Sequence, residues 1–120
     1  MKWLLPIFFI PIILFGQKNT VKEVDSTGYY IQMANFNKKT NNYKFSLTYS
    51  QKAFDFANQK NDNNGKATAL HSLGVTYYEL RKYADAIAAL SKSIELFAAL
   101  PPSSEAALCY YELGMCYMNI

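Results

Sequence analysis

A chain of 120 residues is long enough for one domain with a leader or a tail. Hydrophobic residues make up 51% of it and charged residues 18%, which excludes an intrinsically disordered protein. The net charge of +3 is too small for a dedicated nucleic-acid-binding protein, and two cysteines are too few for a disulfide-rich scaffold.

Residues 1–16 have the pattern of a secretory signal peptide. Lys2 precedes a run from Trp3 to Phe15 in which no side chain is charged. As a helix this run would span about 20 Å, less than the roughly 30 Å of a bilayer core, so we expect no stable membrane span. We expect cleavage near Gly16 and export to the periplasm or the outside of the cell. A buried N-terminal helix or strand is the alternative.

Residues 17–66 are predicted to form a degenerate helical repeat. Apolar or small residues at positions 43, 47, 50, 54 and 57 recur at intervals of three and four, which places them on one side of a helix. The cluster Asp-Asn-Asn-Gly at positions 62–65 is typical of a turn between helices. No segment after residue 16 alternates cleanly as a strand would, so we expect an all-α fold.

Residues 67–106 form the clearest repeat, and residues 107–120 match its first helix. Five positions recur forty residues apart, and four of the five are identical. The two series are Ala67, Leu70, Leu73, Gly74 and Tyr77, and then Ala107, Tyr110, Leu113, Gly114 and Tyr117. Between them, Pro101 and Pro102 end one helix, and Ser103 or Ser104 is expected to cap the next.

Gly74 is informative because glycine inside a helix costs about 1 kcal/mol relative to alanine. Close approach of a second helix would offset that cost, and Ala86 offers a small surface on the following helix. We therefore expect two antiparallel helices in each unit, joined by a tight turn near Arg81. The residues expected to pack between helices are Leu70, Leu73, Gly74, Tyr77, Ala86, Leu90, Tyr110, Leu113, Gly114 and Tyr117.

Residues 67–100 resemble a tetratricopeptide repeat, with Leu73-Gly74 and Tyr77 on the first helix and Ala86 and Leu90 on the second. The unit exceeds the standard length of about 34 residues and looks like the exported bacterial type with repeats of about 40. Residues 27–60 match only weakly. The resemblance implies helical hairpins stacked as a short right-handed α-solenoid. A generic helical hairpin with a chance glycine is the alternative.

This resemblance implies a non-catalytic module that binds a peptide or partner protein on its concave face. In the family register, that face is lined by Asn35, Thr68, His71, Val75, Tyr78, Leu108, Tyr111 and Met115. Ordinary solvent-facing or inter-repeat packing positions are the alternative for these residues. Among the positions that clamp C-terminal carboxylates in the family, only Asn35 matches, so capture of an acidic tail is not expected.

Two further expectations concern the setting of the repeats. An exported leader before such repeats also resembles the sensory input region of bacterial signalling proteins, for example sensor histidine kinases, and this is the alternative function. The helix predicted over 107–120 lacks a second helix to cover it and carries Leu108, Tyr111, Met115 and Met118 outside its main stripe. We expect the chain to be an N-terminal fragment of a longer protein, or to self-associate through 107–120.

No catalytic, cofactor-binding or metal-binding site is predicted, and no nucleic-acid partner is expected. Cys109 and Cys116 are seven residues apart, about 10.5 Å along one helix, whereas disulfide partners need Cα atoms within about 7 Å. Both are expected to be small apolar packing residues. An enzyme using His71 with one of these cysteines is the remaining alternative, but no third catalytic group is indicated.

Overall fold

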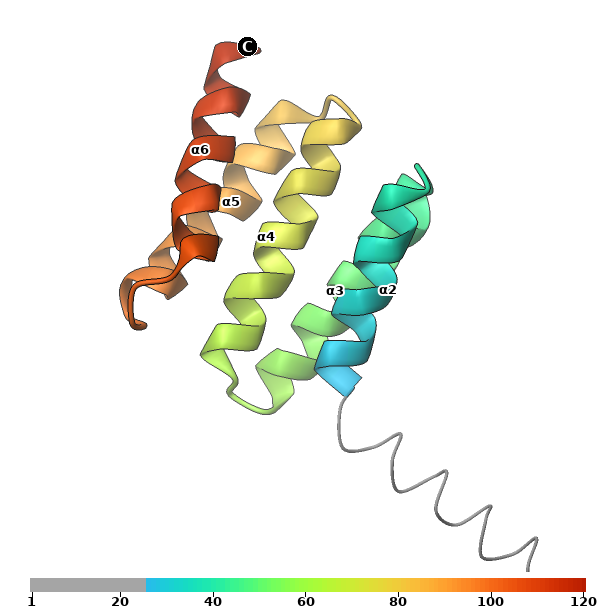
Figure 1. The fold of residues 1–120 in the computed structure, drawn as a ribbon, viewed down its shortest axis with the longest axis vertical. Coiled ribbons are helices and arrows are strands. Elements are labelled where there is room, and N and C mark those ends of the chain that lie inside the picture. Colours follow the sequence, from blue (N-terminus) through green and yellow to red (C-terminus); the bar gives the residue numbers. More distant parts are fainter. Residues whose placement is uncertain (1–25) are drawn as a thin grey trace, which may run out of the picture.

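The computed structural model describes residues 26–120, so the predicted leader and its cleavage near Gly16 lie outside the described residues. The described part contains five helices (Figure 1). They are α2 (Ser26–Lys39), α3 (Tyr43–Gln59), α4 (Asn63–Glu79), α5 (Tyr83–Ala98) and α6 (Ser104–Met118). The prediction of an all-α fold built from helical hairpins is confirmed for this part of the chain. None of its helices is both long and apolar enough to cross a membrane.

The helices form two layers. In Figure 1, α4 lies between α2 and α6, while α3 and α5 lie behind them. Each helix packs against the next one in sequence, and α4 also contacts both α2 and α6 across the front layer. Residues from α2, α4 and α6 are therefore brought together on one side of the molecule, although about forty residues separate corresponding positions.

Three tight turns of the same kind join the first four helices. In each, one residue has left-handed backbone geometry and the next donates its amide N–H to a carbonyl five residues earlier, which ends the helix. The left-handed residues are Asn41 (φ 62°), Asn61 (φ 54°) and Arg81 (φ 61°). Their spacing of twenty residues sets the start of each helix, and two such intervals give the forty-residue repeat.

The turn before α4 lies earlier than the sequence predicts. Asp62 is the residue that caps the helix, and its carboxylate accepts a hydrogen bond from the Gly65 amide at 2.9 Å. Asn63 and Asn64 are therefore helical, rather than part of a turn. A Cβ atom at position 65 would overlap the Asp62 carboxylate, so the glycine makes room for the cap. At the start of α6, Ser103 caps the helix by accepting from the Ala106 amide at 3.2 Å.

Close helix packing around Gly74 defines the centre of the fold. A Cβ atom there would lie 2.5 Å from Leu90 Cγ and 3.4 Å from the Ala86 carbonyl oxygen, so α5 rests directly on the α4 backbone. Leu90 and Ala86 have no exposed surface. Close approach also occurs between α2 and α3 and between α3 and α4. The small residues on these helices that are fully buried are Ala34, Ala53 and Ala57.

Buried hydroxyl pairs join α3 to α4, a feature that sequence reasoning missed. Ser46 Oγ lies 2.9 Å from Thr76 Oγ1, and Ser50 Oγ lies 2.7 Å from Ser72 Oγ. The two serines of α3 lie in the stretch of residues 27–60 that resembles the family only weakly. They are inter-helix contacts in which each buried hydroxyl has a partner, which removes most of the cost of burying it.

Three residues of α6 that were expected to pack between helices do not do so. Tyr110 and Tyr117 are 61% and 57% exposed, and a Cβ atom on Gly114 would have nothing within 4 Å. The corresponding side of α4 is covered by α5, but no described element covers this side of α6. Leu113 differs from the other three, because it is partly buried against the core.

Candidate functional site on the concave face

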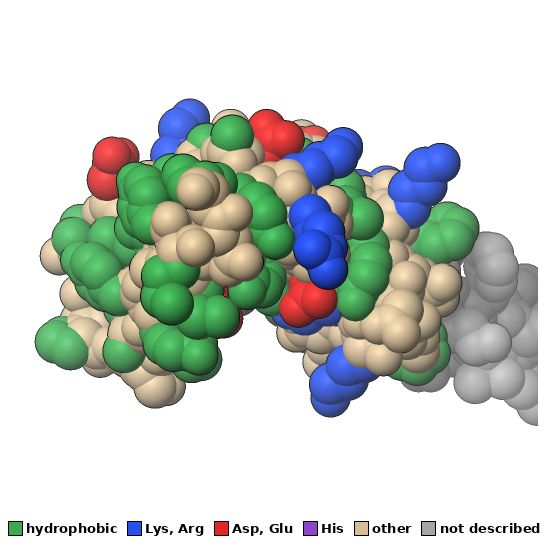
Figure 2. Space-filling view, turned by 90° about the horizontal axis from the view of Figure 1, so that it is seen from above, with side chains coloured by type: hydrophobic (Ala, Val, Ile, Leu, Met, Phe, Trp, Pro, Cys, Tyr) green, Lys and Arg blue, Asp and Glu red, His purple; other side chains and the backbone are tan. Residues whose placement is uncertain are grey.

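The concave face is formed by α2, α4 and α6. Seen from above, this side of the molecule is hollowed, with acidic and basic side chains at the hollow (Figure 2).

His71 occupies the middle of this face and connects two repeats. Its Nδ1 lies 3.0 Å from Glu105 Oε2 and its Nε2 lies 2.7 Å from Glu112 Oε2. Glu105 also accepts a hydrogen bond of 3.1 Å from the hydroxyl of Thr68. The His71 ring comes from α4 and both carboxylates come from α6, so these bonds fix α6 against α4 across the concave face.

The electrostatic surroundings keep His71 charged. Burial acts to lower the pKa of His71, but the hydrogen bonds and charges of Glu105 and Glu112 outweigh it and raise the pKa to about 9. In turn, the hydrogen bond from His71 lowers the pKa of Glu105 below its usual value. At neutral pH the ring is therefore an imidazolium that donates from both nitrogens to carboxylates.

Lys38 of α2 faces the same group of charges. Burial lowers the pKa of Lys38, and the negative charges of Glu112, Glu79 and Glu105 act in the opposite direction. Three helices of three successive repeats thus contribute charges to this group. Lys38 and His71 are its central cations and Glu105 and Glu112 its central anions, while Lys39 and Glu79 add one further charge of each sign. Because their charges balance, the centre of the concave face carries no strong net attraction for a highly charged ligand.

The residues predicted to line the concave face are distributed as follows. Asn35 is exposed on α2, and Thr68, His71, Val75 and Tyr78 are partly exposed on α4. On α6, Leu108 and Tyr111 are 50% and 64% exposed, while Met115 is partly exposed.

The structure brings part of this set together. Thr68 and His71 meet α6 through the two glutamates, and the Tyr78 hydroxyl accepts a hydrogen bond of 3.4 Å from Asn119 at the end of α6. Ser72, the neighbour of His71 in sequence, does not reach this face, because it is buried between α3 and α4.

Sequence reasoning missed the role of Glu105 and Glu112. Neither carboxylate was predicted to take part in a site. Their spacing of seven residues, two turns of one helix, was the available signal, because it places both carboxylates on the same side of α6. Which residue they face depends on how α6 docks on α4, and local patterns do not contain that information.

The two cysteines have packing roles in the described chain. Both are free and fully buried. Burial raises the pKa of Cys109 to about 11, although a contact of 3.5 Å with Ser93 Oγ acts the other way. Cys109 therefore stays a thiol at neutral pH, while both nitrogens of His71 are bonded to carboxylates. Within residues 26–120, no three His, Cys, Asp or Glu side chains are grouped as a metal site would require.

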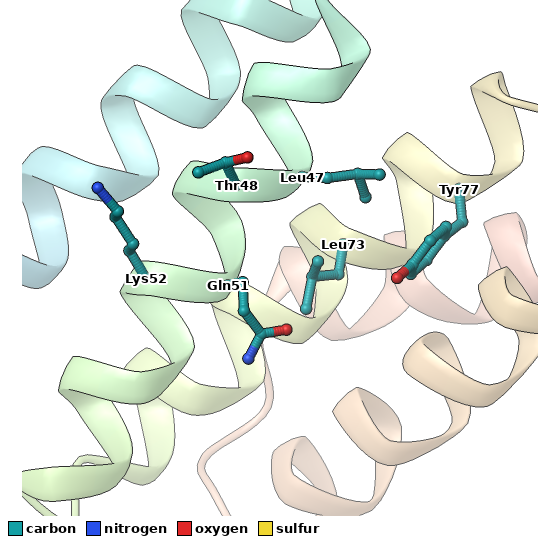
Figure 3. A pocket seen from close by; sticks show the side chains of 6 residues that line it. All are labelled: Leu47, Thr48, Gln51, Lys52, Leu73 and Tyr77. Carbon is teal, nitrogen blue, oxygen red and sulfur yellow. The ribbon is translucent and has the colours of Figure 1, made fainter.

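A second depression lies between α3 and α4, outside the predicted site (Figure 3). Its volume is about 420 Å³. Leu73 and Tyr77 of α4 contribute apolar surface, and α3 contributes Leu47, Thr48, Gln51 and Lys52. It is a shallow, mixed surface, with neither a buried polar group directed into it nor an enclosed volume for a small molecule.

Comparison with known protein families identifies the family of this chain. The family model described as Tetratricopeptide repeat matches residues 26–99, which covers α2 to α5 and more than half of the chain. No curated protein and no solved structure matches the chain.

Proposed function

This chain belongs to the tetratricopeptide repeat family, whose helical repeats serve as protein–protein interaction scaffolds, and we propose that its concave face binds a peptide segment of a partner protein. The observation that carries this proposal is the exposure of Leu108 and Tyr111 next to the fixed charges of the concave face. Large apolar side chains beside ordered polar groups are typical of surfaces that anchor a peptide.

The position of Leu108 supports this assignment. It lies three residues after Glu105 and four residues before Glu112, so it shares their side of α6. Both glutamates are held by His71, which leaves Leu108 presented between two immobile carboxylates. A surface ordered before binding loses less side-chain entropy when a ligand arrives.

The chemistry of the face defines the kind of peptide it would accept. The charges of Lys38, His71, Glu105 and Glu112 are mutually compensated, so the main attraction comes from apolar contact with Leu108 and Tyr111. Asn35 on α2 offers hydrogen bonds to a peptide backbone at the other side of the hollow. We therefore expect a segment with apolar anchor residues and few charges, rather than an acidic tail.

The proposal is tested by selecting short peptides from a displayed random library on the purified chain and locating them by NMR chemical-shift changes. We expect selected peptides to shift amides of α2, α4 and α6 around Asn35, His71 and Tyr111. Peptides that shift only α3 and α5, or a library that yields no binder, would contradict a peptide-binding concave face.

A sensory role is the second candidate, favoured by the signal-peptide pattern of residues 1–16 ahead of the repeats. In this setting the chain would be exported, and ligand binding to the repeats would be passed to a signalling domain of the same protein. The reading frame after codon 120 tests this idea directly. A continuing frame with a membrane helix and an output domain supports it, and an immediate stop codon contradicts it.

A further inference from the structure

One side of α6 presents two exposed tyrosines and a glycine that no described element covers. It contains Tyr110, Gly114 and Tyr117, whose spacing of four and three residues aligns them along the helix. The two tyrosines are more than half exposed, and the space above Gly114 is open. We call these three residues the Gly114 face. It differs from the side of α6 that carries Glu105 and Glu112, so it is separate from the concave face.

The chain itself shows what covers such a surface. Forty residues earlier, Leu70, Gly74 and Tyr77 occupy the same positions on α4. There α5 packs against them, with Leu90 placed so close to Gly74 that a Cβ atom would meet it at 2.5 Å. The first hairpin is built in the same way. Its second helix, α3, packs against its first helix, α2, and Ala34 is fully buried forty residues before Gly74.

We propose that the Gly114 face binds an amphipathic helix of the α5 type, antiparallel to α6, whose leucine rests on Gly114 as Leu90 rests on Gly74. The matching pattern on the incoming helix is a small residue followed four positions later by leucine, as in Ala86 and Leu90. The small residue permits close approach, and the leucine fills the space left by the missing Cβ.

A second folded copy of this chain fits the surface less well. Two α6 helices facing each other would place glycine and tyrosines against glycine and tyrosines, with no leucine to occupy the space above Gly114. Leu90 is fully buried in its own hairpin, so a folded copy cannot present it. A folded copy does expose Leu108, but that leucine lies between Glu105 and Glu112 and would bring their carboxylates against the tyrosines. The occupant we infer is thus a helix that is not already packed.

A peptide with the sequence of residues 82–100, which covers α5, is a suitable probe. We expect the fluorescently labelled peptide to bind the chain saturably, and Gly114→Leu to weaken this binding about tenfold or more, because a leucine there fills the contact. Gly114→Leu should leave the fold intact, since no atom lies within 4 Å of the new Cβ. Tyr111→Ala, which alters the concave face, should leave binding of the peptide unchanged.

A probe peptide in which the residue equivalent to Leu90 is aspartate should not bind. The proposal is overturned if the unaltered peptide does not bind, or if it binds wild type and Gly114→Leu equally. It is also overturned if the purified chain dimerises and Gly114→Leu abolishes the dimer, because a second copy would then be the occupant. Failure at this face leaves peptide binding on the concave face unaffected, so the two proposals are tested separately.

Discussion

Leu90 sits directly against Gly74, so closely that a Cβ atom at position 74 would lie 2.5 Å from its Cγ. This contact allows α5 to lie against the α4 backbone, and it explains why a helix tolerates glycine at a central position. The equivalent Gly114 on α6 has open space in place of the leucine. The two glycines are therefore a matched pair for testing the packing.

Gly74→Leu should destabilise the chain by about 1–3 kcal/mol, because the added side chain forces α4 and α5 apart. Gly114→Leu should not destabilise it, since its side chain enters open space and leucine has a higher helix propensity than glycine. Urea unfolding followed by circular dichroism measures both. Equal effects of the two substitutions would contradict the close contact between α4 and α5.

His71 should make stability depend on pH. Its folded pKa of about 9 lies above the ordinary value of 6.5, so its stabilising contribution is fully present below about pH 6.5 and is lost as pH rises through 9. For a shift of this size we expect the free energy of unfolding to fall by about 3 kcal/mol over this pH range. The comparison of wild type with His71→Gln at pH 6 and pH 9.5 isolates this contribution, because the effects of Lys38 and Cys109 are common to both proteins.

In these measurements the unfolding free energies of wild type and His71→Gln should converge toward high pH. A difference between them that stays constant from pH 6 to pH 9.5 would show that the bonds to Glu105 and Glu112 do not hold the proton on His71. Glu105 should affect stability in the acidic range instead. Its pKa is lowered in the folded chain, so its contribution to the free energy of unfolding is lost as pH falls and the carboxylate becomes protonated.

The buried pair of Ser50 and Ser72 should behave as a coupled unit. Ser50→Ala removes one partner and leaves the Ser72 hydroxyl buried without it, at a cost of about 1–3 kcal/mol. The double variant Ser50→Ala with Ser72→Ala should recover part of that loss, because no unpaired hydroxyl remains. A double-mutant cycle by urea unfolding gives the coupling, and strictly additive effects would show that the two hydroxyls do not interact.

Both cysteines should resist labelling in the folded chain. They are buried, and burial raises the pKa of Cys109 to about 11, so little thiolate is present at pH 8. We expect a thiol reagent to modify Cys109 and Cys116 slowly in buffer and rapidly in denaturant. Rapid labelling of folded protein at a single site, located by mass spectrometry, would show that the thiol is accessible.

The part of this structure that sequence patterns predict is the part set by spacing along one helix. The helical periodicity follows from residues three and four positions apart. The repeat follows from matching patterns within two helices, and the approach of α5 follows from the small residues Gly74 and Ala86 on adjacent helices. The start of α4 is an exception, because the sequence predicts a turn over residues 62–65 whereas the helix begins at Asn63. An Asn-Asn-Gly run favours a turn unless the residue before it caps a helix, as Asp62 does here.

Contacts between repeats were not predictable in the same way. The bond between Ser50 and Ser72 and the link from His71 to the two glutamates depend on the docking of one hairpin on another. The exposure of Gly114 has a related cause, since a repeated motif predicts packing only where a second helix is in place. The leader over residues 1–16 and its processing remain predictions.

The most direct test of peptide binding on the concave face compares two aromatic residues of similar exposure. Tyr111 on α6 is 64% exposed and Phe45 on α3 is 60% exposed, so alanine at either position should cost little stability. For a peptide selected on the wild-type chain, titration calorimetry should show affinity reduced about tenfold by Tyr111→Ala and unchanged by Phe45→Ala. Unchanged affinity in Tyr111→Ala, or an equal loss in both variants, would contradict recognition on the concave face.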